Sequence, residues 1–307
     1  MIDVQKLYDV FLNPNHKLDS ANLEWFVNRI REVVVKSFSE SGKARPPRLR
    51  ASNFGKKDRE LWFEFNQKRP GMDGVISQIE HGGEIDDINT NFISGDTYMK
   101  FLNGDIIEAI LILLMKEAGY SVDVSQPELN VNDVTGHPDC IVTHTDGTTE
   151  VIDTKSASRF AFGPKFVDGG LITGDDAFGY VGQNSHYRQA TKANTSGWLA
   201  ANKDTGELAY LELPREKEID ARQRIDHLKA ILRKPEPPPE LCHPLEQDKD
   251  GNTKIGKGCG YCVFKHQCHE GLRGFKHNGK WTYYTNIVKE PKGVEWKADA
   301  EYYAEEE

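Results

Sequence analysis

The sequence has no long apolar run and only a small, odd number of cysteines. In 307 residues the longest apolar run spans residues 109–115, far short of the roughly 20 residues that a membrane-spanning helix needs. The N-terminus has an early Asp3 and no basic segment followed by an apolar one, so we expect no signal peptide and a cytoplasmic protein. The five cysteines, three of them within ten residues, do not resemble the framework of a secreted disulfide-bonded protein.

The chain also has no excess of basic over acidic residues. The 39 Lys and Arg residues are outnumbered by 48 Asp and Glu residues, which gives a formal net charge of -9 and excludes a uniformly basic nucleic-acid-binding protein. Residues 43–69, however, hold nine basic and three acidic side chains, and residues 251–280 hold six and one. Residues 295–307 form an acidic tail. Two basic segments on an acidic chain fit local contacts with a polyanion, although solvated charged faces would give the same pattern.

Hydrophobic periodicity predicts a mixture of helices and strands. Helices are expected over residues 23–38, 60–65, 97–118, 183–193 and 215–234, and strands over residues 122–131, 140–143, 150–154, 197–202 and 208–213. Asp146-Gly147 predicts a hairpin turn, residues 70–95 an irregular loop, and the run PEPPPE a stiff linker. We therefore expect three segments: an N-terminal helical region with a basic connector (1–95), an α/β core (96–235) and a Cys-rich lobe with an acidic tail (236–307).

The most informative stretch is residues 136–158, GHPDCIVTHTDGTTEVIDTKSAS. Side chains of a strand alternate between faces, so Asp153 and Lys155 point the same way, and hairpin pairing can bring Asp139 beside them. Adjacent carboxylates repel unless a cation lies between them, and their hard oxygen atoms suit Mg²⁺ or Mn²⁺. A lysine beside that metal can orient or deprotonate an attacking water, or stabilise charge that develops on a phosphoryl group.

Further polar residues lie on the flanking predicted helices. Glu108 is surrounded by apolar residues in the 97–118 helix; a buried Glu needs a partner, and a metal would serve, although a polar stripe beside Asp105 is the alternative. Gln183 and Tyr187 are four residues apart and share one helix face, a spacing that is also common on ordinary helices. An amide and a phenol on one face suit hydrogen bonding to a phosphate backbone or stacking on a base.

The order of these elements resembles the PD-(D/E)XK nuclease superfamily. It is similar in particular to the RecB-like exonuclease branch, including phage members and the iron–sulfur nucleases of CRISPR adaptation. Pro138-Asp139 matches the PD position, residues 153–155 match (D/E)xK, and Gln183 and Tyr187 match the QxxxY motif. Glu108 stands where many members have His and some phage-type members have Glu. The resemblance covers roughly residues 48–270 and implies an α/β, restriction-endonuclease-like core with a mixed central sheet flanked by helices.

The same resemblance implies a metal-dependent DNA exonuclease. It would act on single-stranded or end-containing duplex DNA, in recombination, repair or phage DNA processing within a bacterial or phage-infected cell, with a recombination or replication protein as a possible partner. Expected metal ligands are Glu108, Asp139 and Asp153, with Lys155, Gln183 and Tyr187 as the remaining catalytic residues. The expected DNA contacts are Arg48, Arg50, Lys56, Lys57 and Arg59. An endonuclease on the same core and a non-catalytic DNA-binding or assembly protein are the alternatives.

The remaining motif is C-x2-C-x5-C. It comprises Cys259, Cys262 and Cys268, and Cys242 precedes it by seventeen positions. Four thiolates can hold zinc or a 4Fe–4S cluster, and neighbouring histidines could also serve zinc. The spacing resembles the cluster motif of AddB-type and CRISPR-associated nucleases, whose fourth cysteine generally comes from the N-terminal side, where this chain has Lys57. We expect Cys242 to replace that ligand and the cluster to be structural, whereas Cys140 is expected in the core.

Overall fold

The structure is a computed structural model that describes residues 1–40, 47–66, 95–174, 176–256 and 258–295. The chain divides into two units. Unit 1 comprises the described residues up to Lys56 and those from residue 95 to Arg233, and unit 2 comprises residues 57–66 and those from Lys234 onward. The expected loop over residues 70–95 and the acidic tail lie almost wholly outside the described residues.

The centre of unit 1 is a five-stranded mixed sheet. Its order is β1-β4-β5-β6-β7, with β5 parallel to β6 and the other neighbours antiparallel. The strands are β1 (Ser121–Asp123), β4 (Cys140–Thr143), β5 (Thr149–Ala157), β6 (Thr195–Asn202) and β7 (Leu208–Glu212). A separate hairpin joins β2 (Leu129–Val131) to β3 (Val134–Gly136). The turn between β4 and β5 has Gly147 at φ 83°, so the hairpin predicted from Asp146-Gly147 is confirmed.

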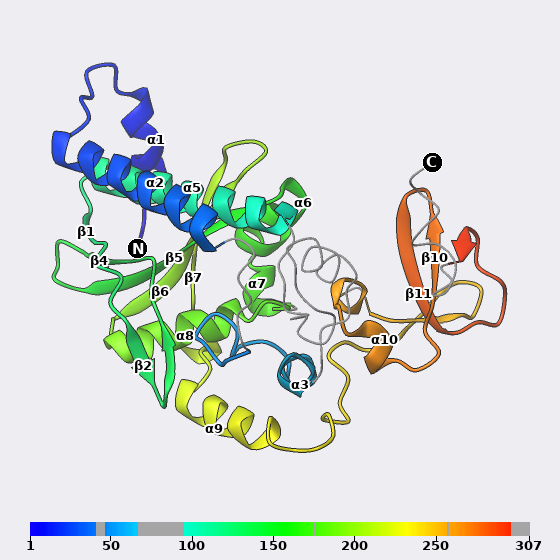
Figure 1. Cartoon of the computed structure of the whole chain (residues 1–307). Coiled ribbons are helices and arrows are strands. Elements are labelled where there is room, and N and C mark those ends of the chain that lie inside the picture. Colours follow the sequence, from blue (N-terminus) through cyan, green and yellow to red (C-terminus); the bar gives the residue numbers. More distant parts are fainter. Residues whose placement is uncertain (41–46, 67–94, 175, 257, 296–307) are drawn as a thin grey trace. The chain divides into compact units, whose positions relative to one another are not determined.

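Helices lie on both faces of this sheet (Figure 1). The longer ones are α1 (Val4–Leu12), α2 (Ser20–Glu40), α5 (Gly95–Glu117), α8 (Tyr180–Thr191) and α9 (Ala221–Ile231); the short ones are α6 (Arg159–Phe162), η2 (Gly163–Val167), α7 (Gly170–Thr173) and η3 (Arg215–Lys217). Helix α5 buries Leu111 and Met115 in one cluster with Cys140 and Ile152. Tyr187 of α8 packs with Val151, the neighbour of Ile152 on β5. The predicted mixed sheet flanked by helices and the core position of Cys140 are therefore confirmed.

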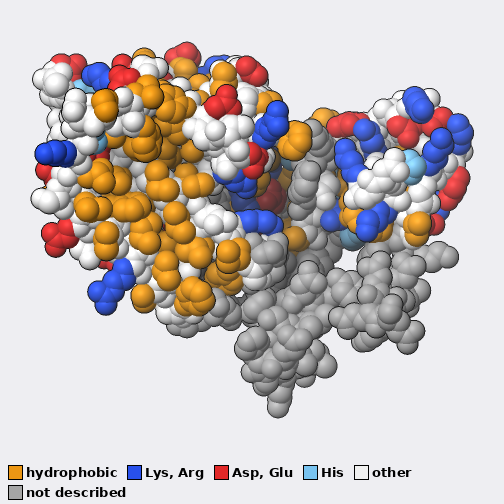
Figure 2. Space-filling model, turned by 90° about the horizontal axis from the view of Figure 1, so that it is seen from above, with side chains coloured by type: hydrophobic (Ala, Val, Ile, Leu, Met, Phe, Trp, Pro, Cys, Tyr) orange, Lys and Arg blue, Asp and Glu red, His pale blue; other side chains and the backbone are white. Residues whose placement is uncertain are grey.

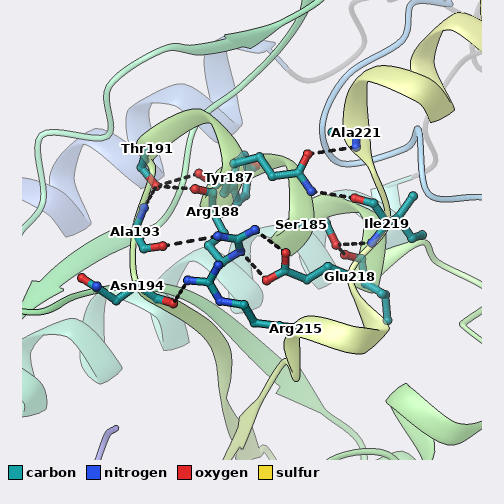
Figure 3. Close-up of polar contacts among 12 residues, drawn as sticks. Ser185, Tyr187, Arg188, Thr191, Ala193, Asn194, Arg215, Glu218, Ile219 and Ala221 are labelled. Atoms are coloured by element: carbon teal, nitrogen blue, oxygen red, sulfur yellow. Dashed lines mark hydrogen bonds and ion pairs between the residues drawn. The ribbon is translucent and has the colours of Figure 1, made fainter.

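Two predicted elements differ from the structure. The strand expected over residues 122–131 is interrupted, because Gln126 has φ 47° and the backbone there leaves the extended conformation. The helix expected from residue 215 begins only at Ala221, with the Asp220 side chain capping its first turn. Residues 215–220 instead contact α8. Ile219 N, for example, donates to Ser185 Oγ at 3.0 Å, as Figure 3 shows.

Unit 2 is built on a second five-stranded sheet, of order β12-β10-β11-β9-β8. Its elements are α3 (Asp58–Asn66), β8 (Glu246–Gln247), β9 (Thr253–Lys254), η4 (Cys259–Tyr261), α10 (Lys265–Cys268), β10 (Arg273–His277), β11 (Lys280–Asn286) and β12 (Val294–Glu295). The expected segments placed the α3 residues with the N-terminal region. Here α3 groups with the Cys-rich residues, because Phe63 stacks on Phe264 with ring centroids 5.7 Å apart.

Hydrogen bonds fix the chain where it passes from one unit to the other. Within unit 1, Arg224 Nη2 on α9 donates to the carbonyl oxygen of Lys56 at 2.6 Å. Within unit 2, Trp62 Nε1 on α3 donates to the carbonyl oxygen of Lys234 at 2.9 Å. Each of these hydrogen bonds therefore joins two segments of the same unit that are far apart in the sequence.

Unit 1 exposes several large apolar side chains, and Figure 2 shows them over a broad area of its surface. They include Val27, Val35 and Phe38 on α2 and Met99 and Phe101 on α5. None of the described helices has both the length and the apolar character that crossing a membrane would require.

Candidate active site

Asp153 and Lys155 lie side by side on strand β5. Lys155 Nζ is 2.5 Å from Asp153 Oδ2, which confirms that the two side chains share a face. Asp153 is only 1% exposed, and no described residue donates a hydrogen bond to its Oδ1 atom. Burial raises the pKa of Asp153 to about 7 although Lys155 opposes this change. Burial would by itself lower the pKa of Lys155, but the charges of Asp153 and Asp139 raise it above its ordinary value.

Asp139 lies at the end of the neighbouring strand. Cys140 pairs with Ile152 in the β4–β5 register, so Asp139 comes next to Asp153 along the paired strands. Its Oδ2 atom accepts hydrogen bonds from the backbone N of Thr154 at 2.6 Å and from Thr154 Oγ1 at 2.8 Å. Thr154 was not predicted as a site residue; its position inside the D-x-K motif is the signal that could have identified it.

Glu108 projects from α5 into a polar environment made by two residues that the sequence did not single out. Its Oε1 atom accepts hydrogen bonds from Arg29 Nη2 at 2.9 Å and from Gln126 Nε2 at 3.1 Å. Burial, with a further contribution from Asp139, raises the pKa of Glu108 to about 8. Arg29 and Gln126 also line a pocket of about 220 Å³ between α2, α5 and the segment after β1. Asp105, one turn earlier on α5, has a pKa raised mainly by burial.

The three predicted ligands affect one another's pKa, but their carboxylates are not grouped around one position. The charge of Asp139 raises the pKa of both Glu108 and Asp153. Over the described part of the chain, however, no three His, Cys, Asp or Glu residues are grouped as metal ligands. The donor chemistry fits Mg²⁺ or Mn²⁺, since all three supply carboxylate oxygens and Asp153 Oδ1 has no partner. To share one cation, Glu108 and Asp153 would have to release Arg29 and Lys155.

One face of α8 meets the same carboxylates. Gln183 Nε2 donates to the Tyr187 hydroxyl at 3.2 Å, and both side chains are buried. Burial and the Asp153 charge raise the pKa of Tyr187 above its ordinary value. Tyr180 precedes them at helical spacing, and Lys155 Nζ lies 4.7 Å from the centroid of its ring. The sequence analysis missed Tyr180, although the spacing i, i+3, i+7 places it on the Gln183–Tyr187 face.

An exposed aromatic ring continues from Tyr180. Phe178 stacks on Tyr180 with ring centroids 5.5 Å apart and an angle of 22° between the rings. Lys165 Nζ lies 4.8 Å from the Phe178 ring centroid. Phe178 remains 53% exposed. Next to the Lys155 ion pair, unit 1 thus presents a flat apolar ring accompanied by a cation.

The opposite side of α8 is fixed by polar contacts with residues 215–221 (Figure 3). Arg188 forms an ion pair with Glu218. Gln189 Nε2 donates to the Ile219 carbonyl oxygen at 2.8 Å, and the Ala221 backbone N donates to Gln189 Oε1 at 3.0 Å. These contacts explain how a helix with so many polar side chains keeps a fixed orientation against the sheet.

The five predicted DNA-contacting residues belong to different units. Arg48, Arg50 and Lys56 are in unit 1, and Lys57 and Arg59 are in unit 2. The Arg48 side chain is exposed. Arg59 Nε donates to Cys268 Sγ at 3.0 Å and its guanidinium also bonds the Pro238 carbonyl oxygen. Arg59 is therefore engaged within unit 2, and DNA contact by these residues stays a prediction.

The four predicted cysteine ligands lie near one another in unit 2. Burial raises the pKa of Cys242 to about 12 and that of Cys259 to about 11, and the charges of neighbouring cysteines add to both effects. Burial also raises the pKa of Cys262. Four thiols suit either an iron–sulfur cluster or zinc. Among the described residues, however, no three of these cysteines are grouped as metal ligands. The four cysteines are thus close enough to affect one another's pKa, and metal binding by them stays a prediction.

Comparison with known proteins gives only remote similarities. No protein-family model and no curated protein sequence matches the chain. Among solved structures, SSO0001 matches with a TM-score of 0.42 and 15% identity over 79% of this chain and 93% of SSO0001. The alkaline exonuclease LHK-Exo from Laribacter hongkongensis matches with a TM-score of 0.32 and 14% identity over 59% of this chain and 92% of the exonuclease. Its complex with dAMP gives a TM-score of 0.32 and 17% identity over the same shares. Because these similarities are remote, activity has to be inferred from the site residues.

Proposed function

We propose that this protein is a metal-dependent DNA exonuclease that hydrolyses phosphodiester bonds. The observation that carries the proposal is the buried Asp153–Lys155 ion pair on β5, with Asp139 at the end of the paired strand. Burying these charges is costly, and a structural role would be served more cheaply by apolar side chains. Asp139 and Asp153, with Glu108 as third ligand, would hold one or two Mg²⁺ or Mn²⁺ ions.

The chain's own residues then have distinct roles. A bound divalent ion would supply Lewis-acid polarisation of the phosphoryl group and an activated water. Lys155 has a raised pKa and is therefore an ammonium group, which suits stabilising negative charge on phosphoryl oxygens better than removing a proton from water. The Tyr180 ring beside Lys155 limits where its ammonium group can move. Thr154 orients the Asp139 carboxylate through two hydrogen bonds.

Action at DNA ends is supported by the exposed ring of Phe178. An unpaired terminal base can stack on such a ring, whereas bases inside a duplex are covered by their neighbours. Lys165 beside the ring offers a cation to the adjacent phosphate. Exonuclease action, rather than sequence- or structure-specific cleavage within a strand, therefore fits this part of the site. Recombination, repair and phage DNA processing in a bacterial or phage-infected cytoplasm are the settings that would use it.

The test is digestion of end-labelled single- and double-stranded DNA with Mg²⁺ or Mn²⁺. Lys155→Ala and Asp153→Ala should each reduce cleavage by about 100-fold or more while the protein stays folded. Lys203→Ala is the matched control, since Lys203 is an exposed lysine on the loop that follows β6. Near-wild-type cleavage by either site variant would overturn the assignment. Cleavage of a circular single strand would identify an endonuclease, and no metal-dependent cleavage at all would favour a non-catalytic DNA-binding protein.

For the cysteines we propose a structural 4Fe–4S cluster held by Cys242, Cys259, Cys262 and Cys268. Its support is the proximity of the four cysteines, whose charges affect one another's pKa, in a unit whose sheet is built of short strands. Protein purified without oxygen should be brown and contain iron and sulfide, and Cys262→Ser should lose both and lower the stability of unit 2. Cys140→Ser is the control, because Cys140 lies in the core of unit 1. Colourless protein with stoichiometric zinc would identify a zinc site.

A further inference from the structure

Unit 2 carries an aromatic surface that the proposed nuclease site does not use. Strands β10 and β11 are antiparallel, and their register pairs Lys276 with Trp281 and Gly274 with Tyr283. Paired residues of an antiparallel sheet lie on the same face. The Trp281 and Tyr283 rings are nearly parallel there, with an angle of 20° and centroids 6.2 Å apart. A Cβ atom on Gly274 would come within 2.9 Å of the Tyr283 ring, so the glycine lets this ring lie flat on the strand.

Cations accompany both rings. Lys276 Nζ lies 5.8 Å from the Trp281 centroid, and Lys265 Nζ of α10 lies 4.7 Å from the Tyr283 centroid. Among the described residues, no carboxylate forms an ion pair with either lysine. The other face of the hairpin differs, since Arg273 there pairs with Glu290 and Glu295. Among the described residues, the two lysines beside these rings thus have no carboxylate partner, whereas the arginine of the other face has two.

We propose that Lys265, Lys276, Trp281 and Tyr283, here called the aromatic–lysine face, bind single-stranded nucleic acid. An unpaired base would stack on the exposed Trp281 ring, which the Tyr283 ring holds in place, and the phosphates would contact the two ammonium groups. A single strand is the occupant with both properties, because a duplex covers its base faces and an acidic peptide has few rings to stack. Residues 251–280 hold six basic side chains and one acidic one, which adds charge complementarity to a polyanion. The inference does not depend on catalysis in unit 1.

The test is binding of a dye-labelled oligothymidylate to the full chain in EDTA, which prevents cleavage. Trp281→Ala should raise the dissociation constant roughly 5- to 100-fold, the range of one lost base–aromatic stack. Trp281→Phe should retain most of the affinity, because a ring is kept. Trp281 is exposed, so its replacement should leave the fold intact, which circular dichroism would verify.

A lysine pair provides the matched electrostatic comparison. Lys276 and Lys280 are both exposed and lie on the same hairpin, but their register places them on opposite faces. Lys276→Gln should reduce the slope of log binding constant against log salt by about 0.7, the value for one phosphate contact on a single strand. Lys280→Gln should leave that slope unchanged.

Three outcomes would overturn the proposal. These are unchanged affinity in Trp281→Ala, equal effects of the two lysine variants, and tighter binding of a duplex than of a single strand. Photo-crosslinking with an iodouracil-containing strand adds a direct readout. Crosslinks to Trp281 or Tyr283 would support the face, and crosslinks confined to unit 1 would refute it. An oligouridylate that binds as tightly as the oligothymidylate would also support the proposal, because the face would contact bases and phosphates but not the sugar.

Discussion

Replacing Glu108 with Gln should stabilise the metal-free protein at high pH. Glu108 is mostly buried, and its pKa rises from 4.5 to about 8 chiefly because burial disfavours the carboxylate. Between these two pH values the folded state keeps a proton that the unfolded state releases. The folded state therefore binds more protons, and the free energy of unfolding falls as the pH rises through this window. A glutamine does not titrate, and its carbonyl oxygen can still accept the hydrogen bond from Arg29.

The size of the effect follows from the same shift. A pKa raised from 4.5 to about 8 corresponds to a loss of at most about 5 kcal/mol above pH 8. Glu108→Gln should consequently match the wild-type stability near pH 4.5 and exceed it by up to about 5 kcal/mol near pH 9. For domains of this size the melting temperature changes by roughly 2–4 °C per kcal/mol, so the difference is easily measured.

Thermal unfolding at pH 5, 7 and 9 in EDTA is the assay. Glu24→Gln is the control, because Glu24 is an exposed glutamate on α2, and it should change stability by less than about 0.5 kcal/mol at each pH. A Glu108→Gln protein that is less stable than wild type at pH 9 would refute the reasoning. So would a stability difference that is independent of pH. Adding Mn²⁺ at pH 9 should then stabilise the wild type more than the variant, since only the wild type offers the third carboxylate.

Two further predictions concern positioning and packing. Thr154→Val removes the 2.8 Å hydrogen bond to Asp139 while keeping the side-chain shape, and should weaken Mn²⁺ binding about 10-fold without unfolding the protein; unchanged affinity in calorimetry would contradict this role. Gly55→Ala places a Cβ 2.3 Å from the Gly179 carbonyl oxygen and should cost about 2–4 kcal/mol of unfolding free energy. Gly104→Ala, on α5 with its nearest atom 3.8 Å away, should instead gain about 0.5–1 kcal/mol, and equal effects of the two substitutions in urea unfolding would exclude the packing argument.

The sequence predicted best what depends on local periodicity. The apolar repeat of α5, the Asp146-Gly147 turn and the alternation of Asp153 and Lys155 were all correct, because each follows from neighbouring residues alone. The helix expected from residue 215 began too early, because the contacts of residues 215–220 with α8 are tertiary and leave no periodic trace.

The surroundings of the site were harder to predict. Arg29 and Gln126 bind Glu108 from positions far apart in the sequence, and no motif joins them. The grouping of α3 with the Cys-rich residues depends on the stacking of Phe63 on Phe264, about 200 residues later. The basic residues were treated as one surface because they are close in sequence, whereas the chain passes from one unit to the other between Lys56 and Lys57. Charge patterns of this kind cannot show which unit receives each side chain.

The hydrogen bonds at the crossings have a mechanical consequence. Arg224 joins α9 to Lys56, just before the chain leaves unit 1, and Trp62 joins α3 to Lys234, where the chain enters unit 2 again. Each bond thus closes a long loop of chain inside its own unit, from Lys56 to α9 in unit 1 and from α3 to Lys234 in unit 2. Loss of either bond would loosen that unit locally.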